Sequence, residues 1–348
     1  MHERRWKDFI PSPSDILVTI LVVVAVVAGL KVSLDILSSN STPDPVSLEG
    51  SHTPGAPTDS TAGPETSSPT STSSPGASTG VVPPSLMTTV ERMAAQMRCQ
   101  TLVTSEPLTA VTYNIKSGRA GGLPRLLGVM RRTDAEVFLL QEVDNHRRST
   151  GNVDQAGWFA SQLGGWHYAF GRNVTFGDGL YGTAVVSKYP ILSWTNTPLP
   201  NINHSQPRGL LHVVINFHGT KVSIYDTHLD NTSGANRLQQ AARISQIMAA
   251  DPNPKILGGD MNTWPGSAPD RVLASRLNDT WNVAGSGKGA THPAGHPRTR
   301  IDFLMYGGPG LRATSAVVLP DTASDHLAVR AQYELSGIKT VKCTRRQE

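Results

Sequence analysis

Short apolar runs, each ending at a polar side chain, recur through the last two thirds of the chain. Strands are expected at 108–115, 136–142, 181–187, 210–217, 222–229, 255–259, 300–306 and 326–333. Helical spacing of apolar residues predicts helices at 123–132, 154–163 and 235–250. Strands separated by helices and hairpins are typical of an α/β sandwich rather than a barrel.

A different pattern occupies the N-terminus, where the residues from Ile16 to Leu30 are apolar and uncharged. Extended to Leu34, this stretch is long enough for a membrane-spanning helix of about 20 residues. The basic residues before it predict that 1–15 stay in the cytoplasm, 16–34 form a transmembrane anchor and the rest lies outside. A cleaved signal peptide is the alternative, since Val26-Val27-Ala28 resembles a small-residue cleavage site. In that case the protein is secreted.

The next segment, 35–98, is dominated by Ser, Thr, Pro and Gly, and no Lys or Arg occurs between Ser38 and Thr89. Such a composition buries too little apolar surface to offset the entropy of ordering, so we expect a disordered linker. The remaining residues, 99–348, are expected to form one catalytic domain.

The net charge of the chain gives a modest indication of the class of substrate. The whole chain carries a formal net charge of +4, and six of its 31 Lys/Arg but nine of its 27 Asp/Glu precede Cys99, so the domain carries +7. A basic domain is suited to an anionic substrate. Nucleic acid, lipid headgroups and cell-wall polymers all remain open, because the basic residues are scattered rather than gathered in a stripe.

Six short strings place polar side chains at predicted strand ends. They are Tyr113-Asn114-Ile115, Gln141-Glu142-Val143, Thr227-His228-Leu229, Gly259-Asp260-Met261-Asn262, Arg300-Ile301-Asp302 and Ser324-Asp325-His326. Carboxylates, amides and two histidines gathered at one edge of a sheet predict an acidic pocket that can hold a metal ion.

The order of these strings resembles the endonuclease/exonuclease/phosphatase superfamily, over roughly Ala110 to Tyr333. The run Gln141-Glu142-Val143-Asp144, followed by Thr150-Gly151-Asn152-Val153-Asp154-Gln155, is most similar to its bacterial metal-dependent hydrolases. The resemblance implies an α-β-β-α sandwich of four layers, a divalent cation and attack of water on a phosphoester. It leaves the substrate open, because the superfamily includes nucleases, sphingomyelinases and inositol phosphatases.

The resemblance also implies roles for individual residues. Glu142 is expected to bind the metal, with Asp325 sharing it, and oxygen ligands favour Mg²⁺ over zinc, with Mn²⁺ or Ca²⁺ as alternatives. Asp260 is expected to deprotonate the attacking water and Asn262 to hold water or phosphate, after a tight turn at Gly258-Gly259.

Asp302 and His326 are predicted to form a dyad, in which the carboxylate orients the imidazole and favours its cation. His228 is expected to bind the phosphate or protonate the leaving oxygen, and Asn114 to support the pocket.

Contacts to the substrate's phosphates are predicted for Arg172, Asn173, Lys188 and Arg208. Lys116 stands where the DNA-repair branch of the superfamily has a metal-binding carboxylate, which argues against a second metal there.

The only two cysteines, Cys99 and Cys343, flank the predicted domain. Outside the membrane an even pair of this kind is typical of a disulfide. The resemblance implies that the first and last strands are close enough for the two ends to meet.

Together these observations predict a monomeric, extracytoplasmic phosphoester hydrolase that depends on a divalent metal. Its chemistry is that of a phosphodiesterase, and a nuclease is one form that this activity takes. Two alternatives stay open. One is a phospholipid or lipid-pyrophosphate phosphoesterase acting at the membrane, and the other is a binding module that kept the fold and lost catalysis.

Overall fold

The computed structural model describes residues 97–345, which form the domain considered below. The predicted anchor and nearly all of the predicted linker lie outside the described residues. Among the described residues, no helix is long and apolar enough to cross a membrane.

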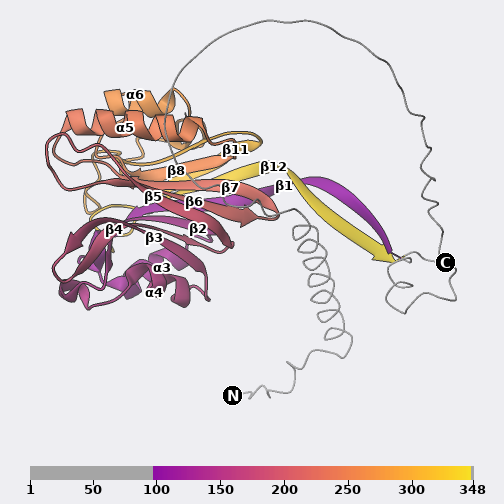
Figure 1. Ribbon diagram of the computed structural model, residues 1–348, viewed down its shortest axis with the longest axis horizontal. Coiled ribbons are helices and arrows are strands. Elements are labelled where there is room, and N and C mark those ends of the chain that lie inside the picture. Colours follow the sequence, from indigo (N-terminus) through magenta and orange to yellow (C-terminus); the bar gives the residue numbers. More distant parts are fainter. Residues whose placement is uncertain (1–96, 346–348) are drawn as a thin grey trace, which may run out of the picture. The chain divides into compact units, whose positions relative to one another are not determined.

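Two six-stranded sheets make up the centre of the domain (Figure 1). The first sheet has the order β11-β12-β1-β2-β4-β3. Its strands are β1 (Met97–Asn114), β2 (Val137–Asn145), β3 (His167–Phe176), β4 (Gly179–Ser187), β11 (Leu311–Val318) and β12 (Val329–Arg345). The second sheet has the order β5-β6-β7-β8-β10-β9. Its strands are β5 (Ile191–Pro198), β6 (Gly209–Phe217), β7 (Thr220–His228), β8 (Lys255–Asp260), β9 (Asn278–Asp279) and β10 (Asp302–Gly307).

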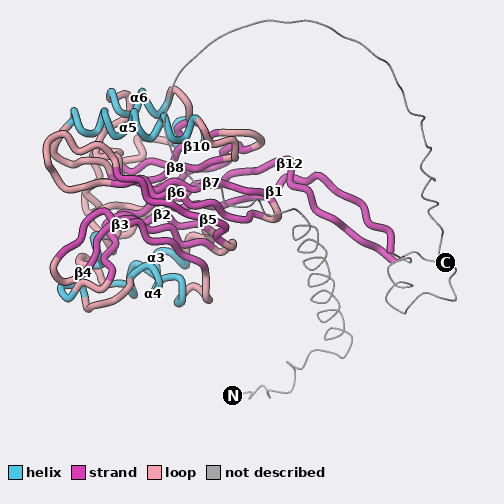
Figure 2. Tube along the Cα trace, viewed as in Figure 1, coloured by secondary structure: helices cyan, strands magenta, loops and turns pink. Residues whose placement is uncertain are grey.

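Helices cover the outer face of each sheet (Figure 2). The helices are α3 (Leu123–Arg131), α4 (Gln155–Gln162), α5 (Gly234–Ala249), α6 (Ala268–Ala274) and α7 (Thr280–Ala284), with single 3-10 turns at η3 (Lys116–Gly118) and η4 (Arg148–Thr150). Apolar side chains of α3 and α4 pack on the first sheet, and those of α5 and α6 pack on the second. A third core fills the space between the sheets. This layering agrees with the predicted α-β-β-α sandwich.

The direction of the strands decides where their ends meet. β1 and β2 are parallel neighbours in the first sheet, as are β7 and β8 in the second. Parallel neighbours end at the same edge of a sheet. Because β10 is antiparallel to β8, it begins where β8 ends. Four strand ends and one strand start therefore gather at one edge of the sandwich.

The chain's first and last described strands, β1 and β12, pair along nearly their whole length and extend beyond the sandwich as a two-stranded ribbon (Figure 1). In this ribbon Cys99 stands opposite Cys343. Directly opposed residues of antiparallel strands have Cα atoms about 4.5–5.5 Å apart, a separation that a disulfide can span. No free cysteine occurs among the described residues, and the bridge itself stays a prediction.

Four strands escaped the sequence prediction, namely β3, β5, β9 and β11. The first two are edge strands of their sheets, so much of each is exposed and lacks the buried apolar run of a central strand. The last strand, predicted from His326, begins at Val329, which leaves His326 in the loop before it.

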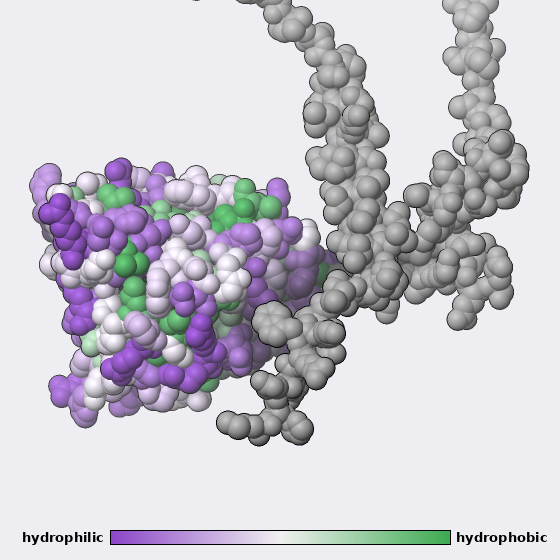
Figure 3. Space-filling model, turned by 90° about the horizontal axis from the view of Figure 1, so that it is seen from below, coloured by the Kyte–Doolittle hydropathy of each residue, from purple (hydrophilic) through white to green (hydrophobic). Residues whose placement is uncertain are grey.

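The polar surface is interrupted by few large apolar side chains. The face in Figure 3, seen from below the view of Figure 1, is mostly hydrophilic with small separate hydrophobic patches.

Candidate active site

Three of the predicted site residues lie side by side on adjacent strands of the second sheet. Asp260, the last residue of β8, is in register with His228 at the end of β7 and with Asp302 at the start of β10. All three side chains are buried, with at most 4% of their surface exposed. The sheet therefore fixes the spacing of two carboxylates and an imidazole in one row.

Asn114 joins this row to the first sheet. Its Nδ2 donates hydrogen bonds to Oε1 of Glu142 and to Oδ2 of Asp260, both at 3.1 Å. Because β1 ends at Asn114 inside the sandwich, the amide is fully buried and held in place. One side chain thus positions both the predicted metal ligand and the predicted base.

Backbone strain concentrates around these residues. Glu142 adopts φ 57°, Asn262 φ 47°, and Lys116 and Ser117 have φ 46° and 51°. The ladder between β2 and β4 shifts register between Leu140 and Val143, so Glu142 lies in a bulge that turns its carboxylate out of the strand. Non-glycine residues in the left-handed region cost about 1–3 kcal/mol each and cluster at functional sites.

The predicted pair of Asp302 and His326 is in contact. Oδ2 of Asp302 lies 2.9 Å from Nδ1 of His326, and both side chains are nearly buried. Burial by itself favours the neutral imidazole, but the carboxylates of Asp302 and Asp260 outweigh it and raise the pKa of His326 to about 9. His326 is therefore a cation at neutral pH.

Asp260 lies between the two histidines. Its Oδ2 is 3.4 Å from Nε2 of His228 and 3.7 Å from Nε2 of His326. Burial, and then the negative charge of Asp302, raise the pKa of Asp260 above its ordinary value. A carboxyl group whose pKa is raised is a stronger proton acceptor than an ordinary carboxylate.

His228 behaves in the opposite way to His326. Burial lowers the pKa of His228 well below its ordinary value, and the charges of Arg208 and His326 lower it further. Its Nδ1 is buried without a hydrogen-bond partner among the described residues. Nδ1 of the neutral His228 ring is therefore a polar atom that still lacks a hydrogen bond among these residues.

Arg208 lies beside this imidazole, and it is only 3% exposed. Its Nε and Nη1 make no hydrogen bond within the described part of the chain. A buried guanidinium with unpaired donors is costly unless an anion reaches it. Arg208 can therefore bind a negatively charged group next to His228.

Lys116 and Asp325 form an ion pair at the rim, with 2.7 Å between Nζ and Oδ2. Although burial opposes it, the ammonium holds the pKa of Asp325 below its ordinary value. The charge of Glu142 also acts on Lys116. The ammonium thus lies near both predicted metal ligands.

One residue of the site was missed from the sequence. The ring centroid of His292 is 4.6 Å from that of His326. His292 lies in the glycine-rich loop before β10, where backbone bonds from Ala294 to Asp325 and from Leu327 to Thr291 hold the loop against the site. Nothing in its local sequence pointed there, because the loop carries no periodic pattern.

The predicted phosphate-contacting residues lie in different parts of the structure. Asn173 packs against Gly209, next to Arg208, whereas Arg172 is exposed and its guanidinium donates a hydrogen bond to Thr175. The prediction for Lys188 is wrong. Its ammonium pairs with Glu136, and Ser187 is in register with Val137 at the start of β2, so Lys188 lies at the opposite end of the sheet from Glu142.

One local interpretation also needs correction. Gly258 and Gly259 lie within β8 rather than in a turn. A Cβ on Gly259, at φ 153°, would stand 2.0 Å from the carbonyl oxygen of Thr227, so the glycine permits close strand pairing. The amide of Asn262 donates one hydrogen bond to the carbonyl oxygen of Leu229 at 3.0 Å, which orients this side chain.

The donor atoms fit a hard divalent cation. Carboxylate oxygens of Asp260 and Asp302 lie within 4.8 Å of each other, and a carboxylate oxygen of Asp325 lies within 4.8 Å of a ring nitrogen of His292. The protonated His326 beside both groups has no lone pair to offer an ion. Oδ1 of Asp302 is buried without a partner among the described residues, and such an oxygen suits a cation. Glu142 belongs to neither group, but it shares the amide of Asn114 with Asp260. The nearby donors are therefore mostly carboxylate oxygens, as Mg²⁺ and Mn²⁺ prefer.

Comparisons with known proteins point in one direction. The sequence profile of the Endonuclease/Exonuclease/phosphatase family matches residues 111–326. The uncharacterized protein YbhP of Escherichia coli K12 is 27% identical in an alignment of length 246 that covers 65% of this chain and 95% of YbhP.

Two solved structures share the fold. An endonuclease/exonuclease/phosphatase from Beutenbergia cavernae is 25% identical, with a TM-score of 0.56 over 66% of this chain and 72% of that one. A mannosyl-6-phosphatase from Bacteroides thetaiotaomicron is 19% identical, with a TM-score of 0.55 over 65% of this chain and 99% of that one.

Proposed function

The chain belongs to the endonuclease/exonuclease/phosphatase family of phosphoester hydrolases, and we propose that it is an extracytoplasmic phosphoesterase that requires a divalent metal. The fold and the family support hydrolysis of a phosphoester. The metal requirement, the location and the roles of individual residues go further and rest on the arguments below.

The observation that carries the proposal is the position of Asp260. Its carboxylate is buried between an amide donor, Asn114, and the two imidazoles of His228 and His326. A carboxylate so enclosed has a fixed direction, and a water beside it can be oriented and deprotonated. We assign the role of general base to Asp260.

Arg208 and His326 supply positive charge around the same point. Two nitrogens of the Arg208 guanidinium lack a hydrogen-bond partner within residues 97–345, and His326 is held as a cation by Asp302. Preorganised donors of this kind stabilise the charge that develops on phosphoryl oxygens during attack. The neutral His228, whose Nδ1 has no partner among the residues that the structure describes, hydrogen-bonds the same phosphate.

A divalent cation completes this charge distribution. Glu142, with Asp325 or the unpaired oxygen of Asp302, would hold it. When bound, the metal would neutralise charge on the phosphate and on the leaving oxygen. Mg²⁺ is our assignment, because the donors are mostly carboxylate oxygens.

The proposed location outside the cytoplasm rests on the N-terminal segment and on the two cysteines that flank the domain. The basic N-terminus followed by an apolar stretch supports an anchored protein whose domain is outside the cytoplasm. The opposition of Cys99 and Cys343 in the ribbon supports a disulfide, which persists in oxidising compartments. An alkaline phosphatase reporter fused after Glu348 should be active if this topology holds, and a reporter active only in the cytoplasm would refute it.

The proposal is tested with the purified full-length protein. Hydrolysis of bis(p-nitrophenyl) phosphate is followed with Mg²⁺, with chelator, and after Mg²⁺ is restored. DNA, RNA, sphingomyelin and lipid phosphates are then compared as substrates, so that a nuclease is separated from a lipid phosphoesterase.

We expect turnover that chelation abolishes and Mg²⁺ restores. Asp260→Asn, which keeps the shape of the side chain, should lose about 10²–10⁴ in rate. Turnover that is indifferent to the chelator would contradict the metal requirement. A protein that hydrolyses no member of the panel would favour the binding-module alternative.

A further inference from the structure

A second concave site lies at the other end of the sandwich, between the edge strands of the two sheets. We define the aromatic cleft as the space lined by Trp166, which precedes β3, by His167 and Tyr168 at the start of β3, and by residues 191–194 of β5. Its volume is about 730 Å³, which is within the range of roughly 300–1,000 Å³ for small-molecule sites.

The strand register separates this cleft from the catalytic residues. His167 is opposite Ser187, and Ser187 is opposite Val137 at the start of β2. Glu142 lies five residues further along β2, which is about 17 Å at the rise of a strand. A ligand in the aromatic cleft would therefore bind at a separate site.

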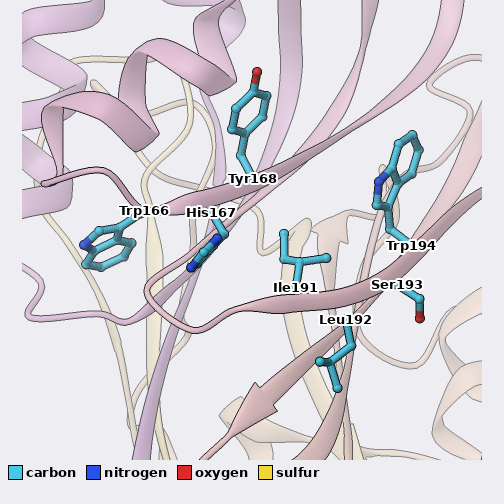
Figure 4. A pocket seen from close by; sticks show the side chains of 7 residues that line it. All are labelled: Trp166, His167, Tyr168, Ile191, Leu192, Ser193 and Trp194. Atoms are coloured by element: carbon cyan, nitrogen blue, oxygen red, sulfur yellow. The ribbon is translucent and has the colours of Figure 1, made fainter. Parts of the chain in front are cut away.

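The walls of the cleft are aromatic and accessible. Tyr168 is 43% exposed, Leu192 50% and Trp194 51%, unusually high values for side chains of this size. Trp166 and His167 lie on one side of the cleft and Trp194 on the other, with Ile191 between them (Figure 4).

Two of the rings are held in place before any ligand arrives. Trp166 packs against Phe138 of the core, with 5.9 Å between ring centroids. The hydroxyl of Tyr168 donates to Oδ2 of Asp154 at 2.8 Å. Fixed rings lose little conformational entropy on binding, so they favour affinity.

Polar groups in the cleft are available as well. Within the described part of the chain, the indole N–H groups of Trp166 and Trp194 and the hydroxyl of Ser193 make no hydrogen bond. His167 likewise has an imidazole without a hydrogen-bond partner among the described residues. The cleft thus combines aromatic faces with unused donors and acceptors.

The absence of charged side chains from the lining of the aromatic cleft limits which ligands it can bind. No Asp, Glu, Lys or Arg lines the aromatic cleft, although the domain as a whole is basic. Nucleic acid and anionic lipid are recognised mainly through Lys and Arg, so they fit this lining poorly. A neutral ligand with both apolar faces and hydroxyl groups fits it well.

We propose that the aromatic cleft binds a neutral saccharide chain. The apolar C–H face of a sugar ring packs on Trp194 or Trp166, and the hydroxyls at the ring edge bond the free donors. Such a site would hold the enzyme on a glycan while the catalytic residues act elsewhere. The inference does not depend on the proposed hydrolysis, because it concerns binding alone.

The test is isothermal titration calorimetry of the full-length protein with four neutral hexasaccharides, those of cellulose, chitin, mannan and amylose. We expect at least one to bind with a Kd between about 10 µM and 1 mM. Trp194→Ala should weaken that binding at least about tenfold. Trp194→Phe, which keeps a ring, should give an intermediate loss.

Trp264→Ala is the matched control. Trp264 is 62% exposed and does not line the cleft, so its loss should leave saccharide binding unchanged. The proposal is overturned if no hexasaccharide binds up to about 5 mM, or if Trp194→Ala binds like the wild type. It is equally overturned if Trp194 instead mediates binding to phosphatidylcholine vesicles or self-association. Circular dichroism of each variant establishes that a loss of binding is not a loss of fold.

Discussion

Replacing Asp302 with asparagine tests the buried charge pair of Asp302 and His326, because the amide keeps the shape of the carboxylate and removes its charge. Burial opposes the charged imidazole, yet the neighbouring carboxylates, Asp302 first among them, raise the pKa of His326 from 6.5 to about 9. The difference between these pKa values corresponds to about 3 kcal/mol in favour of the folded protein.

The pH dependence of this contribution has a definite sign. Below pH 6.5 His326 is protonated in both folded and unfolded chains, so the stabilisation is complete. As the pH rises through about 9 the folded protein loses the proton, and the stabilisation disappears. Asp302→Asn should therefore lower the free energy of unfolding by about 2–3 kcal/mol at pH 6 and by little at pH 10.

Urea unfolding followed by circular dichroism, in buffer without divalent cations, measures this difference. Asp279→Asn is the control, since Asp279 forms a buried bidentate pair with Arg300 at 3.0 and 2.6 Å. Arginine keeps its charge across this pH range, so the control should lose similar stability at both pH values. An equal loss for Asp302→Asn at pH 6 and pH 10 would refute the charged dyad.

Three further predictions concern binding and redox state. Arg208→Met should raise the free energy of unfolding in phosphate-free buffer by about 1–3 kcal/mol, because it removes a buried unpaired charge. The same variant should no longer be stabilised by added phosphate. A lower free energy of unfolding in urea than that of the wild type would contradict this prediction. Lys116→Met should tighten Mg²⁺ binding about tenfold in calorimetry, since an ammonium near the ligands repels a divalent cation by about 1–2 kcal/mol; Lys188→Met, at the far end of the sheet, should leave the affinity unchanged. Alkylation of the denatured protein from its native compartment should label no thiol until a reductant is added, and two labelled thiols would exclude the bridge between Cys99 and Cys343.

The sequence predicted the central strands and the motifs at their ends because burial leaves a clear signal there. β7 and β8 are apolar runs closed by His228 and Asp260, and both are buried throughout their final residues. Parallel neighbours end at one edge, so the gathering of those two side chains followed from the pattern. The helix α4 was equally clear, since Asp154 caps it by accepting a hydrogen bond from the backbone of Gly157.

The errors arose where a residue's place depends on strand direction. Lys188 follows an apolar run just as Glu142 does, but β4 is antiparallel to β2, so its end lies at the opposite edge. Sequence alone does not give the direction of a strand. The edge strand β5 shows the other difficulty, because its exposed residues include Leu192 and Trp194 and follow no alternation. The aromatic cleft was therefore invisible from the sequence.

His292 illustrates a third difficulty. It reaches the site through a loop whose position is set by backbone bonds to residues more than 30 positions away, such as that from Ala294 to Asp325. No local pattern encodes such a contact.

The central claim is that Asp302 and His326 act as one unit with Asp260 in metal-dependent phosphoester hydrolysis. The most direct measurement is the rate of bis(p-nitrophenyl) phosphate hydrolysis in Mg²⁺ by the wild type, Asp302→Ala, His326→Ala and the double variant. Residues that act as a unit lose activity non-additively. We predict a loss of about 10²–10⁴ for each single variant and little further loss for the double. A folded His326→Ala protein that kept near-wild-type hydrolysis would contradict the account.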